Sequence, residues 1–220
     1  VIPMRVIIIG GGNTGRALAD RLEDRGENVV IVEQDEDVVE QGRNKGYKVE
    51  LGDGTDTETL RSSGAENAKI IVAATGNDDA NLLVAQLSKS NFDVEEVIAK
   101  VNNPDNVDAF EDLGVRSIDA GMASAWAIDN QIERPALAGW MTGADRTGDV
   151  QEVELTNAEF DNTAIQEFGP MLPEDCLIAL VGRDGETHVP HADFTVEVGD
   201  KLTLLGQRDQ VREGMRLVGS

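Results

Sequence analysis

Residues 4–33 read MRVIIIGGGNTGRALADRLEDRGENVVIVE and contain a complete strand, turn, helix and strand pattern. The β-branched run at 6–9 is typical of a strand that is buried on both faces. Leu18 and Leu22 then lie on one face of a helical pattern whose charged residues lie largely on the other. A second β-branched run at 29–32 ends at Glu33. The segment therefore predicts a βαβ unit.

Three glycines between the first strand and the helix have the G-x-G-x-x-G spacing. In that motif Gly10 allows the tight turn, Gly12 lets the backbone approach a pyrophosphate, and Gly15 lets the helix pack closely on the strand. The unpaired N–H groups and the partial positive charge at the helix start favour phosphates. The same spacing occurs in glycine-rich turns that bind nothing, but here the strand and helix that the motif requires are both present. We therefore predict a mononucleotide- or dinucleotide-binding unit.

Glu33 lies at the end of the second predicted strand, eighteen residues after Gly15. At this position a carboxylate can accept hydrogen bonds from both hydroxyls of an adenosine ribose. A 2′-phosphate would meet a negative charge there. Glu33 therefore favours NAD or an adenine nucleotide over NADP.

The chain is strongly acidic, with 42 Asp and Glu against 19 Lys and Arg and a formal charge of −23. The acids are spread over the whole chain rather than gathered in a tail, which argues against disorder. Such a charge repels itself and destabilises a fold at low salt, so we expect a halophilic source with molar internal salt. The sequence shows no basic stripe, and we therefore expect no nucleic-acid partner.

The length of 220 residues suits one large or two small domains with a sizeable core. No apolar run approaches the ~18 residues that span a bilayer, and the start has no signal-sequence pattern. The single cysteine, Cys176, lies in the apolar run CLIALV and is expected in the core. Disulfides and cysteine-based metal sites are therefore not expected. We expect an intracellular protein.

Strand and helix patterns alternate from the first βαβ unit to about residue 119, which predicts a Rossmann-like, doubly wound parallel sheet. Ligands bind such sheets at the carboxyl ends of the strands. The residues expected at that edge are the loop at 10–15, Glu33, Asp53, Thr75, Asn77 and Lys100. The expected strands are 6–9, 29–32, 47–51, 69–74, 97–101 and 115–118, and further helices are 35–45, 57–63, 80–90 and 104–113.

The pattern changes after the sixth strand. Residues 120–140 predict one long helix that Pro135 ends or kinks, with an apolar face suited either to the core or, as we favour, to a subunit interface. The polar segment 142–149 is the expected boundary, which gives domains at 1–141 and 142–220. The second domain is expected to be a small α+β fold. Its predicted strands are 150–155, 176–181, 187–190, 193–196 and 201–205, its helices are 163–168 and 209–218, and Asp184-Gly185 predicts a hairpin turn.

Five segments together resemble the regulator of potassium conductance family (RCK, or KTN), the TrkA-like cytosolic regulatory subunits of Trk- and Ktr-type potassium transporters. They are IIIGGGNTGRALA (7–19), LGDGTD (51–56), SSGAENAKIIVAATGNDDANLLVAQ (62–86), AKVNNPDN (99–106) and LIALVGRDGETHVPHADFTVEVGDKLTLLG (177–206). The resemblance covers nearly the whole chain. Its middle segments are more specific than the glycine loop, because general dehydrogenases lack the G-D-[AG]-T-D and A-T-x-x-D-x-x-N-L combination.

The resemblance implies a role for each matching position. The loop at 10–14 would wrap the phosphates, Glu33 would hold the ribose, and Asp53 with Thr55 would line the adenosine side. Thr75 and Gly76 would approach the phosphates or a second ribose. Lys100 stands where the family usually has arginine, which keeps the charge but loses the bidentate fork, and Gly54 stands where alanine is commoner. The candidate nucleotide-binding residues are Gly10, Gly11, Gly12, Asn13, Thr14, Gly15, Glu33, Asp53, Thr55, Thr75, Gly76, Asn77 and Lys100.

The resemblance also implies a function. The chain would be a nucleotide-sensing regulator of potassium uptake, with NAD(H) favoured as ligand and ATP/ADP possible, and without catalytic or metal-binding residues. It would form a homodimer, assemble into a larger ring, and dock on a membrane transporter subunit at the cytoplasmic face of the cell membrane. A ligand can change such an assembly only if it binds one conformation better than another.

Three alternatives remain open. An NAD-dependent oxidoreductase needs an acid or base near the reacting carbon, yet His188 and His191 both lie in the second domain and the single tyrosine, Tyr47, begins a strand. A metal sensor could use His188, His191 and Asp193, but an extended segment would point the two histidines to opposite faces. A regulator of another cation transporter or antiporter would share the same two domains.

Overall fold

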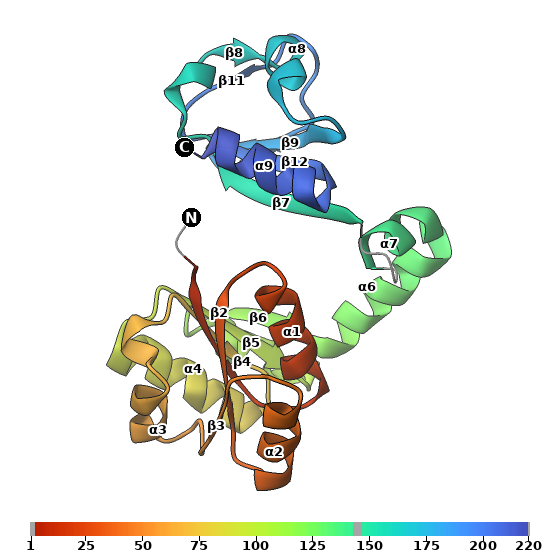
Figure 1. The fold of residues 1–220 in the computed structure, drawn as a ribbon. Coiled ribbons are helices and arrows are strands. Elements are labelled where there is room, and N and C mark those ends of the chain that lie inside the picture. The colour runs from red at the N-terminus through yellow and green to blue at the C-terminus, as the bar shows by residue number, and fades with distance from the viewer. Residues whose placement is uncertain (1–2, 143–146, 220) are drawn as a thin grey trace. The chain divides into compact units, whose positions relative to one another are not determined.

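The computed structural model describes residues 3–142 and 147–219 (Figure 1). The chain divides into two compact units, Val1–Ala127 and Ile128–Ser220. This division falls within helix α6 (Ala120–Glu133). The boundary expected between residues 141 and 142 adjoins the segment 143–146, which lies outside the described residues, and it stays a prediction.

The first unit is a six-stranded parallel sheet in the order β3-β2-β1-β4-β5-β6. The order reverses between β1 and β4, as in other doubly wound folds, and so confirms the predicted fold class. The strands are β1 (Arg5–Ile9), β2 (Asn28–Glu33), β3 (Val49–Leu51), β4 (Ile70–Ala73), β5 (Glu96–Val101) and β6 (Arg116–Asp119). The helices are α1 (Asn13–Glu23), α2 (Glu36–Asn44), α3 (Thr57–Ser62), α4 (Asp78–Phe92) and α5 (Val107–Glu111), with 3-10 turns η1 (Ala65–Asn67) and η2 (Pro104–Asn106).

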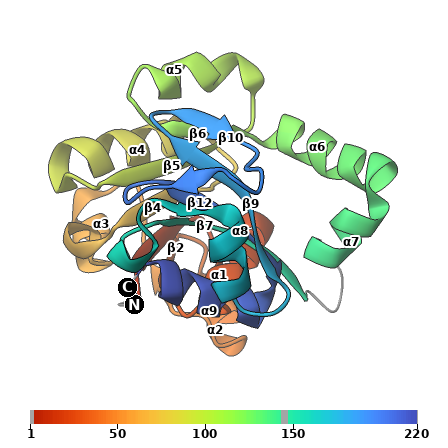
Figure 2. The ribbon, with the colours of Figure 1, turned by 90° about the horizontal axis from the view of Figure 1, so that it is seen from above.

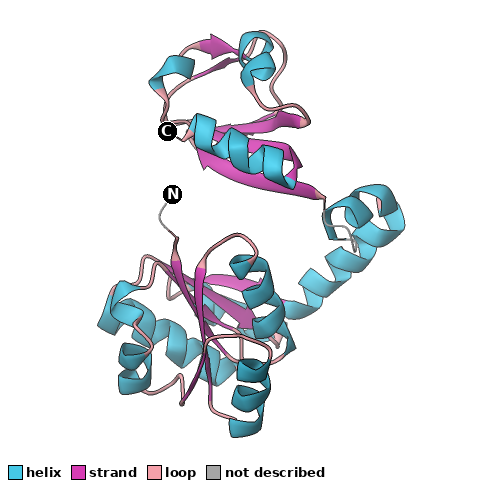
Figure 3. Ribbon diagram, viewed as in Figure 1, coloured by secondary structure: helices cyan, strands magenta, loops and turns pink. Residues whose placement is uncertain are grey.

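Helices cover both faces of this sheet (Figure 3). Strand β1 shows why, because its side chains alternate between two buried clusters. Ile7 and Ile9 pack with residues of α3, α4 and α5, whereas Val6 and Ile8 pack with residues of α1 and α2. The β-branched run therefore forms a strand buried on both faces, as predicted.

Several predicted elements differ in extent from the structure. Strand β3 begins at Val49 rather than Tyr47. The helix expected at 104–113 is a 3-10 turn followed by the short helix α5. The long helix expected at 120–140 is two helices, α6 and α7 (Pro135–Thr142), which meet at a bend (Figure 2). Pro135 has no N–H to continue α6 but fits the first position of α7.

The second unit contains the four-stranded antiparallel sheet β10-β9-β12-β7, which packs against helix α9. The Asp184-Gly185 turn joins β9 to β10 with φ angles of 52° and 81°, the left-handed values that a tight hairpin requires. A small sheet pairs β11 with β8, so the helix expected at 163–168 begins as a strand. The elements are β7 (Gly148–Glu154), η3 (Ala158–Phe160), β8 (Thr163–Ala164), α8 (Ile165–Phe168), η4 (Gly169–Met171), β9 (Cys176–Arg183), β10 (Glu186–His188), β11 (Thr195–Val196), β12 (Lys201–Gln207) and α9 (Arg208–Val218).

Cys176 is only partly buried, at the start of β9, rather than fully within the core. Burial still raises the pKa of its thiol. Among the described helices, none is both long and apolar enough to cross a membrane.

Candidate functional site

A cavity of about 510 Å³ opens at the carboxyl edge of the parallel sheet. Five neighbouring strands supply its walls, in the spatial order β3, β2, β1, β4 and β5. Its volume lies within the ~300–1,000 Å³ range of small-molecule sites. The predicted site residues that line it are Gly10, Gly12, Asn13, Thr14, Glu33, Asp53, Thr55, Thr75, Gly76, Asn77 and Lys100. The structure therefore brings together residues from distant parts of the sequence.

The three motif glycines occupy three different environments. Gly10 has a φ of +109°, and a Cβ there would lie 3.0 Å from the backbone of Ala74. Gly15 does not line the cavity; a Cβ on it would lie 1.9 Å from the carbonyl oxygen of Gly10, so α1 packs directly on the loop. Gly12 lines the cavity and has no atom within 4 Å of its Cβ position. Gly10 is therefore required by the turn, Gly15 is required by the packing of α1, and Gly12 leaves open space in the cavity.

The first turn of α1 is free to bind an anion. Among the described residues no side chain caps it, and it carries no acidic residue. The neighbouring helices differ, because Asp35 caps α2, Asp56 caps α3 and Asn77 caps α4, each accepting hydrogen bonds from backbone N–H groups. These three helices also have acids in their first turns, whereas α1 leaves its N–H groups and partial positive charge facing the cavity.

The Glu33 carboxylate is held by backbone amides. Its Oε2 accepts a hydrogen bond from the Gly11 N–H at 2.7 Å, and its Oε1 accepts from Gln34 at 2.8 Å and Asp35 at 3.0 Å. A carboxylate has about four acceptor sites, so one remains for a direct bond from a ribose hydroxyl. That position is on Oε2, which already accepts from Gly11, so a second ribose bond would have to be a third hydrogen bond to one oxygen. Gly11 does not line the cavity and contributes by fixing this carboxylate.

The G-D-G-T-D segment forms a tight turn beside Glu33. The Asp53 Oδ1 accepts from the Thr55 N–H at 2.9 Å and from its hydroxyl at 2.7 Å. Gly54 lies against β1, since a Cβ there would be 2.2 Å from Cγ2 of Ile9. The alanine that is commoner in the resembling family would need Ile9 to move, and this explains why glycine suits the present sequence.

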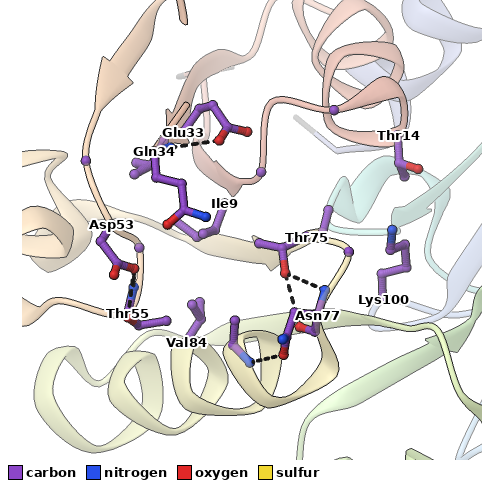
Figure 4. A pocket seen from close by; sticks show the side chains of 18 of the residues that line it. Ile9, Thr14, Glu33, Gln34, Asp53, Thr55, Thr75, Asn77, Val84 and Lys100 are labelled. Atoms are coloured by element: carbon purple, nitrogen blue, oxygen red, sulfur yellow. Dashed lines mark hydrogen bonds between the residues drawn. The ribbon is translucent and has the colours of Figure 1, made fainter. Parts of the chain in front are cut away.

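Charge is distributed unevenly along the cavity. Figure 4 places Glu33, Asp53 and Thr55 toward one end, Thr75 between, and Thr14 and Lys100 toward the other. Within the described lining, Lys100 is the only cationic side chain. An elongated ligand with hydroxyl groups at one end and phosphates toward the other matches this arrangement.

Two polar residues of α4, Asp78 and Asn81, were not among the predicted site residues. They are the D and N of the A-T-x-x-D-x-x-N-L segment. The Asp78 carboxylate accepts from the N–H and side-chain amide of Asn102, the N–H of Asn103 and the side-chain amide of Asn106, at 2.7–2.9 Å. Burial opposes its ionisation, but these hydrogen bonds outweigh burial and lower its pKa from 3.8 to about 2. Asp78 therefore ties the start of α4 to the loop after β5.

The lowered pKa of Asp78 predicts a loss of stability in acid. The folded-state pKa lies below the unfolded value of 3.8, so the stabilisation is complete above about pH 4 and disappears as the pH falls toward 2. Asp78→Asn removes the charge and with it this stabilisation. The variant should therefore be less stable than the parent chain above pH 4, and the difference should shrink as the pH falls from 4 toward 2. Hydrogen exchange of the loop at 102–106 at pH 6 and at pH 3 measures this. A deficit that stays constant would contradict the assignment.

His188 and His191 lie in the second unit. The His191 Nδ1 is 2.6 Å from Asp193 Oδ1, and Phe194 lies beside both rings, with centroids 5.7 Å and 6.0 Å away. The described part of the chain contains no group of three or more side chains arranged to hold a metal ion.

The strand order and the glycine loop at its switch point define a Rossmann-like domain with a cavity at the switch point, followed by a small α+β domain. Residues 6–119 match the TrkA-N domain and residues 150–219 match the TrkA-C domain. The chain belongs to the TrkA family of RCK proteins.

The relatives of the chain are consistent with this membership. It is 30% identical over 220 residues to a Trk system potassium uptake protein TrkA homolog of Methanothermobacter thermautotrophicus, covering 97% of this chain and 98% of that one. It is 28% identical over 220 residues to the Trk system potassium uptake protein TrkA of Mycobacterium tuberculosis, covering 98% of each. The RCK domain of GsuK has the same fold at 22% identity, with a TM-score of 0.53 over 95% of this chain and 45% of that one.

Proposed function

We propose that this chain is a nucleotide-sensing regulatory subunit that controls potassium uptake by a Trk- or Ktr-type membrane transporter. The observation that supports the proposal is the cavity, where the Glu33 carboxylate, the uncapped start of α1 and, within the described lining, a single cationic side chain follow one another along the sheet edge. Membership of the TrkA family supplies the link to potassium transport. The chain would act at the cytoplasmic face of the membrane, held there by its transporter partner.

The ligand we propose is NAD(H), with ATP or ADP as the alternative. Glu33 would hold the adenosine ribose, the loop at 10–14 would bind the phosphates, and Thr75, Gly76 and Lys100 would contact the far end of the ligand. Related structures include a GsuK channel bound to NAD and GsuK bound to ADP. A carboxylate at the ribose position disfavours a 2′-phosphate, so NADPH should bind weakly.

Calorimetric titration with NADH, NAD, ATP, ADP and NADPH tests this proposal. The titrations belong in molar KCl, because the formal charge of −23 points to a fold adapted to high salt. Saturable binding of at least one of the first four ligands, with NADPH weak, is the expected result. A folded sample that binds none of them would contradict the proposal.

Glu33→Ala should weaken binding of every adenine nucleotide. The substitution removes the ribose acceptor and also the three hydrogen bonds that hold the loop and the start of α2. Losing a charge-assisted hydrogen bond and this preorganisation corresponds to about 10- to 100-fold in Kd. Titration of the variant measures the loss.

Glu40→Ala is the matched control for Glu33→Ala. It removes one acid from an exposed position of α2 and does not touch the cavity. Its affinity should equal that of the parent chain. If Glu33→Ala also binds normally, Glu33 does not hold the ribose.

We also propose a homodimer that assembles into a larger ring. Helix α6 has no buried residue in the single chain, and Met122, Trp126, Ile128 and Ile132 are 51–70% exposed. Large apolar side chains exposed in this number are typical of an interaction surface. Light scattering in molar KCl would report the mass of the assembly, and a monomer at all concentrations would contradict the proposal.

A regulator of a different cation transporter is the second candidate. The chain is 28% identical over 167 residues to the putative Na(+)/H(+) antiporter YjbQ of Bacillus subtilis, covering 76% of this chain and 26% of that one.

We propose no catalytic activity. Glu33, Asp53 and Lys100 are the charged groups of the described lining, and both carboxylates are already engaged in holding backbone turns.

A further inference from the structure

Asn81 is a fully buried polar residue of α4, below the loop that follows β4. All four of its hydrogen-bonding positions are used. Its Oδ1 accepts from the Thr75 N–H at 3.0 Å and from the Thr75 hydroxyl at 2.7 Å. Its Nδ2 donates to the Lys100 carbonyl at 2.9 Å and to the Thr75 carbonyl at 3.3 Å. A side chain that is both buried and saturated in this way fixes the groups it contacts.

These contacts lie where the sheet opens. Strands β4 and β5 pair as far as Ala73 and Ala99, and no further pair joins them beyond that point. The next residues along the strands include Thr75 and Lys100, which line the cavity. Asn81 bridges the two backbones at this gap, in place of a strand-to-strand hydrogen bond. It therefore sets the separation between the Thr75 loop and the strand end that carries the Lys100 side chain.

Asp78 lies one helical turn before Asn81 and holds the loop that follows β5. Its carboxylate binds the loop from Asn102 to Asn106, directly after β5. The Asn102 side chain also donates to the Thr75 carbonyl at 3.3 Å. Two residues on the same helix thus fix both the end of β5 and the chain that leaves it.

We propose that Asn81 is a positioning residue for the part of the nucleotide farthest from its adenosine, acting through Thr75 and Lys100 without touching the ligand. This inference rests on the proposed function. The opposite end of the cavity, with Glu33 and Asp53, has no hydrogen bond to Asn81. The contribution of Asn81 should therefore depend on how far a ligand extends from its adenosine toward Lys100.

The series AMP, ADP and ATP tests this dependence. In Asn81→Ala the Thr75 loop and the Lys100 backbone lose their common support, so ATP affinity should fall about tenfold or more. ADP should fall less, and AMP less than about threefold. General damage to the domain would lower all three affinities equally, so the gradient separates positioning from a structural role.

Two further variants make the test decisive. Ser88→Ala alters another fully buried polar residue of α4, whose hydroxyl bonds only its own helix at the Val84 carbonyl, and it should leave all three affinities unchanged. Asn81→Asp keeps both acceptor bonds to Thr75 and sets an oxygen against the carbonyls of Thr75 and Lys100. It should give the same gradient if Asn81→Ala does not fold.

Each outcome has one reading. A graded loss from AMP to ATP supports the inference. Equal losses, or unchanged affinity for ATP or NADH in folded Asn81 variants of a chain that binds that ligand, overturn it and leave the proposed function intact. A parent chain that binds no nucleotide overturns the proposed function, and the inference with it.

Discussion

Gly15→Ala is expected to destabilise the first unit by about 3 kcal/mol or more and to abolish nucleotide binding. The added methyl would lie 1.9 Å from the Gly10 carbonyl oxygen, which is backbone and cannot rotate away. Helix α1 must then move off β1, and the loop between them moves with it. Far-UV circular dichroism during urea unfolding in molar KCl measures the stability, and hydrogen exchange of β1 locates the change.

Gly12→Ala is the comparison that separates the two roles. Its backbone φ of −68° is compatible with alanine, and its added methyl would meet no protein atom within 4 Å. The fold should therefore tolerate it, while the methyl occupies space that a phosphate needs. We expect unchanged unfolding and a Kd raised about tenfold or more. If Gly12→Ala binds normally, the ligand does not approach the loop as proposed.

The fold of the first unit was predictable because its signals are local. A β-branched run, a glycine turn and a helical stripe each span a few residues, and the order of strands follows from joining such units with right-handed connections. The identities of Glu33, Asp53, Thr75 and Lys100 could be read for the same reason, since each follows directly from the end of a predicted strand. Parallel strands bring those ends to one edge.

The hydrogen bonds within the site could not be predicted from the sequence in this way. Glu33 was expected to hold the ribose, but its carboxylate also accepts hydrogen bonds from the backbone N–H groups of Gly11 in the glycine loop and of Gln34 after β2. Asn81 had a readable signal, since it shares the buried stripe of α4 with Val84, Ala85, Ser88 and Phe92. A polar residue on an apolar stripe needs partners. The partners of Asn81 are backbone groups at the point where the pairing of β4 with β5 ends, and the sequence does not show where that point is.

The second unit depends on contacts that are far apart in sequence. Arg183, at the end of β9, forms a two-pronged ion pair with Asp200, with Nε–Oδ1 of 2.7 Å and Nη2–Oδ2 of 2.6 Å. Its guanidinium also bonds Glu197 at 2.8 Å and the Thr195 carbonyl at 2.9 Å, and lies 5.5 Å from the centre of the Phe194 ring. The pairing depends on the register of β9 and β12, which shifts at a bulge between Thr203 and Leu204. Sequence spacing alone does not reveal that shift.

Arg183→Met is expected to destabilise the second unit by about 3 kcal/mol. The Asp200 side chain is only 3% exposed, and without Arg183 it keeps a hydrogen bond from the Glu197 amide but loses its ion pair. Hydrogen exchange of the β12 amides in molar KCl measures the loss. Lys201→Met is the matched control, because that lysine is 63% exposed and its nitrogen lies 3.9 Å from Glu152, so the loss should stay below about 1 kcal/mol.

The pH dependence identifies the cause of the Arg183→Met effect. Burial alone would raise the pKa of Asp200, but the hydrogen bonds from Arg183 and the Glu197 amide, together with the charge of Arg183, lower it below 3.8. In the parent chain this stabilisation is present above pH 4 and is lost as the pH falls below the unfolded value. In Arg183→Met the buried Asp200 should instead favour its protonated form, so the deficit should be largest at neutral pH and shrink toward pH 4. A deficit that does not change with pH would mean that Arg183 acts by packing on Phe194 rather than through the ion pair.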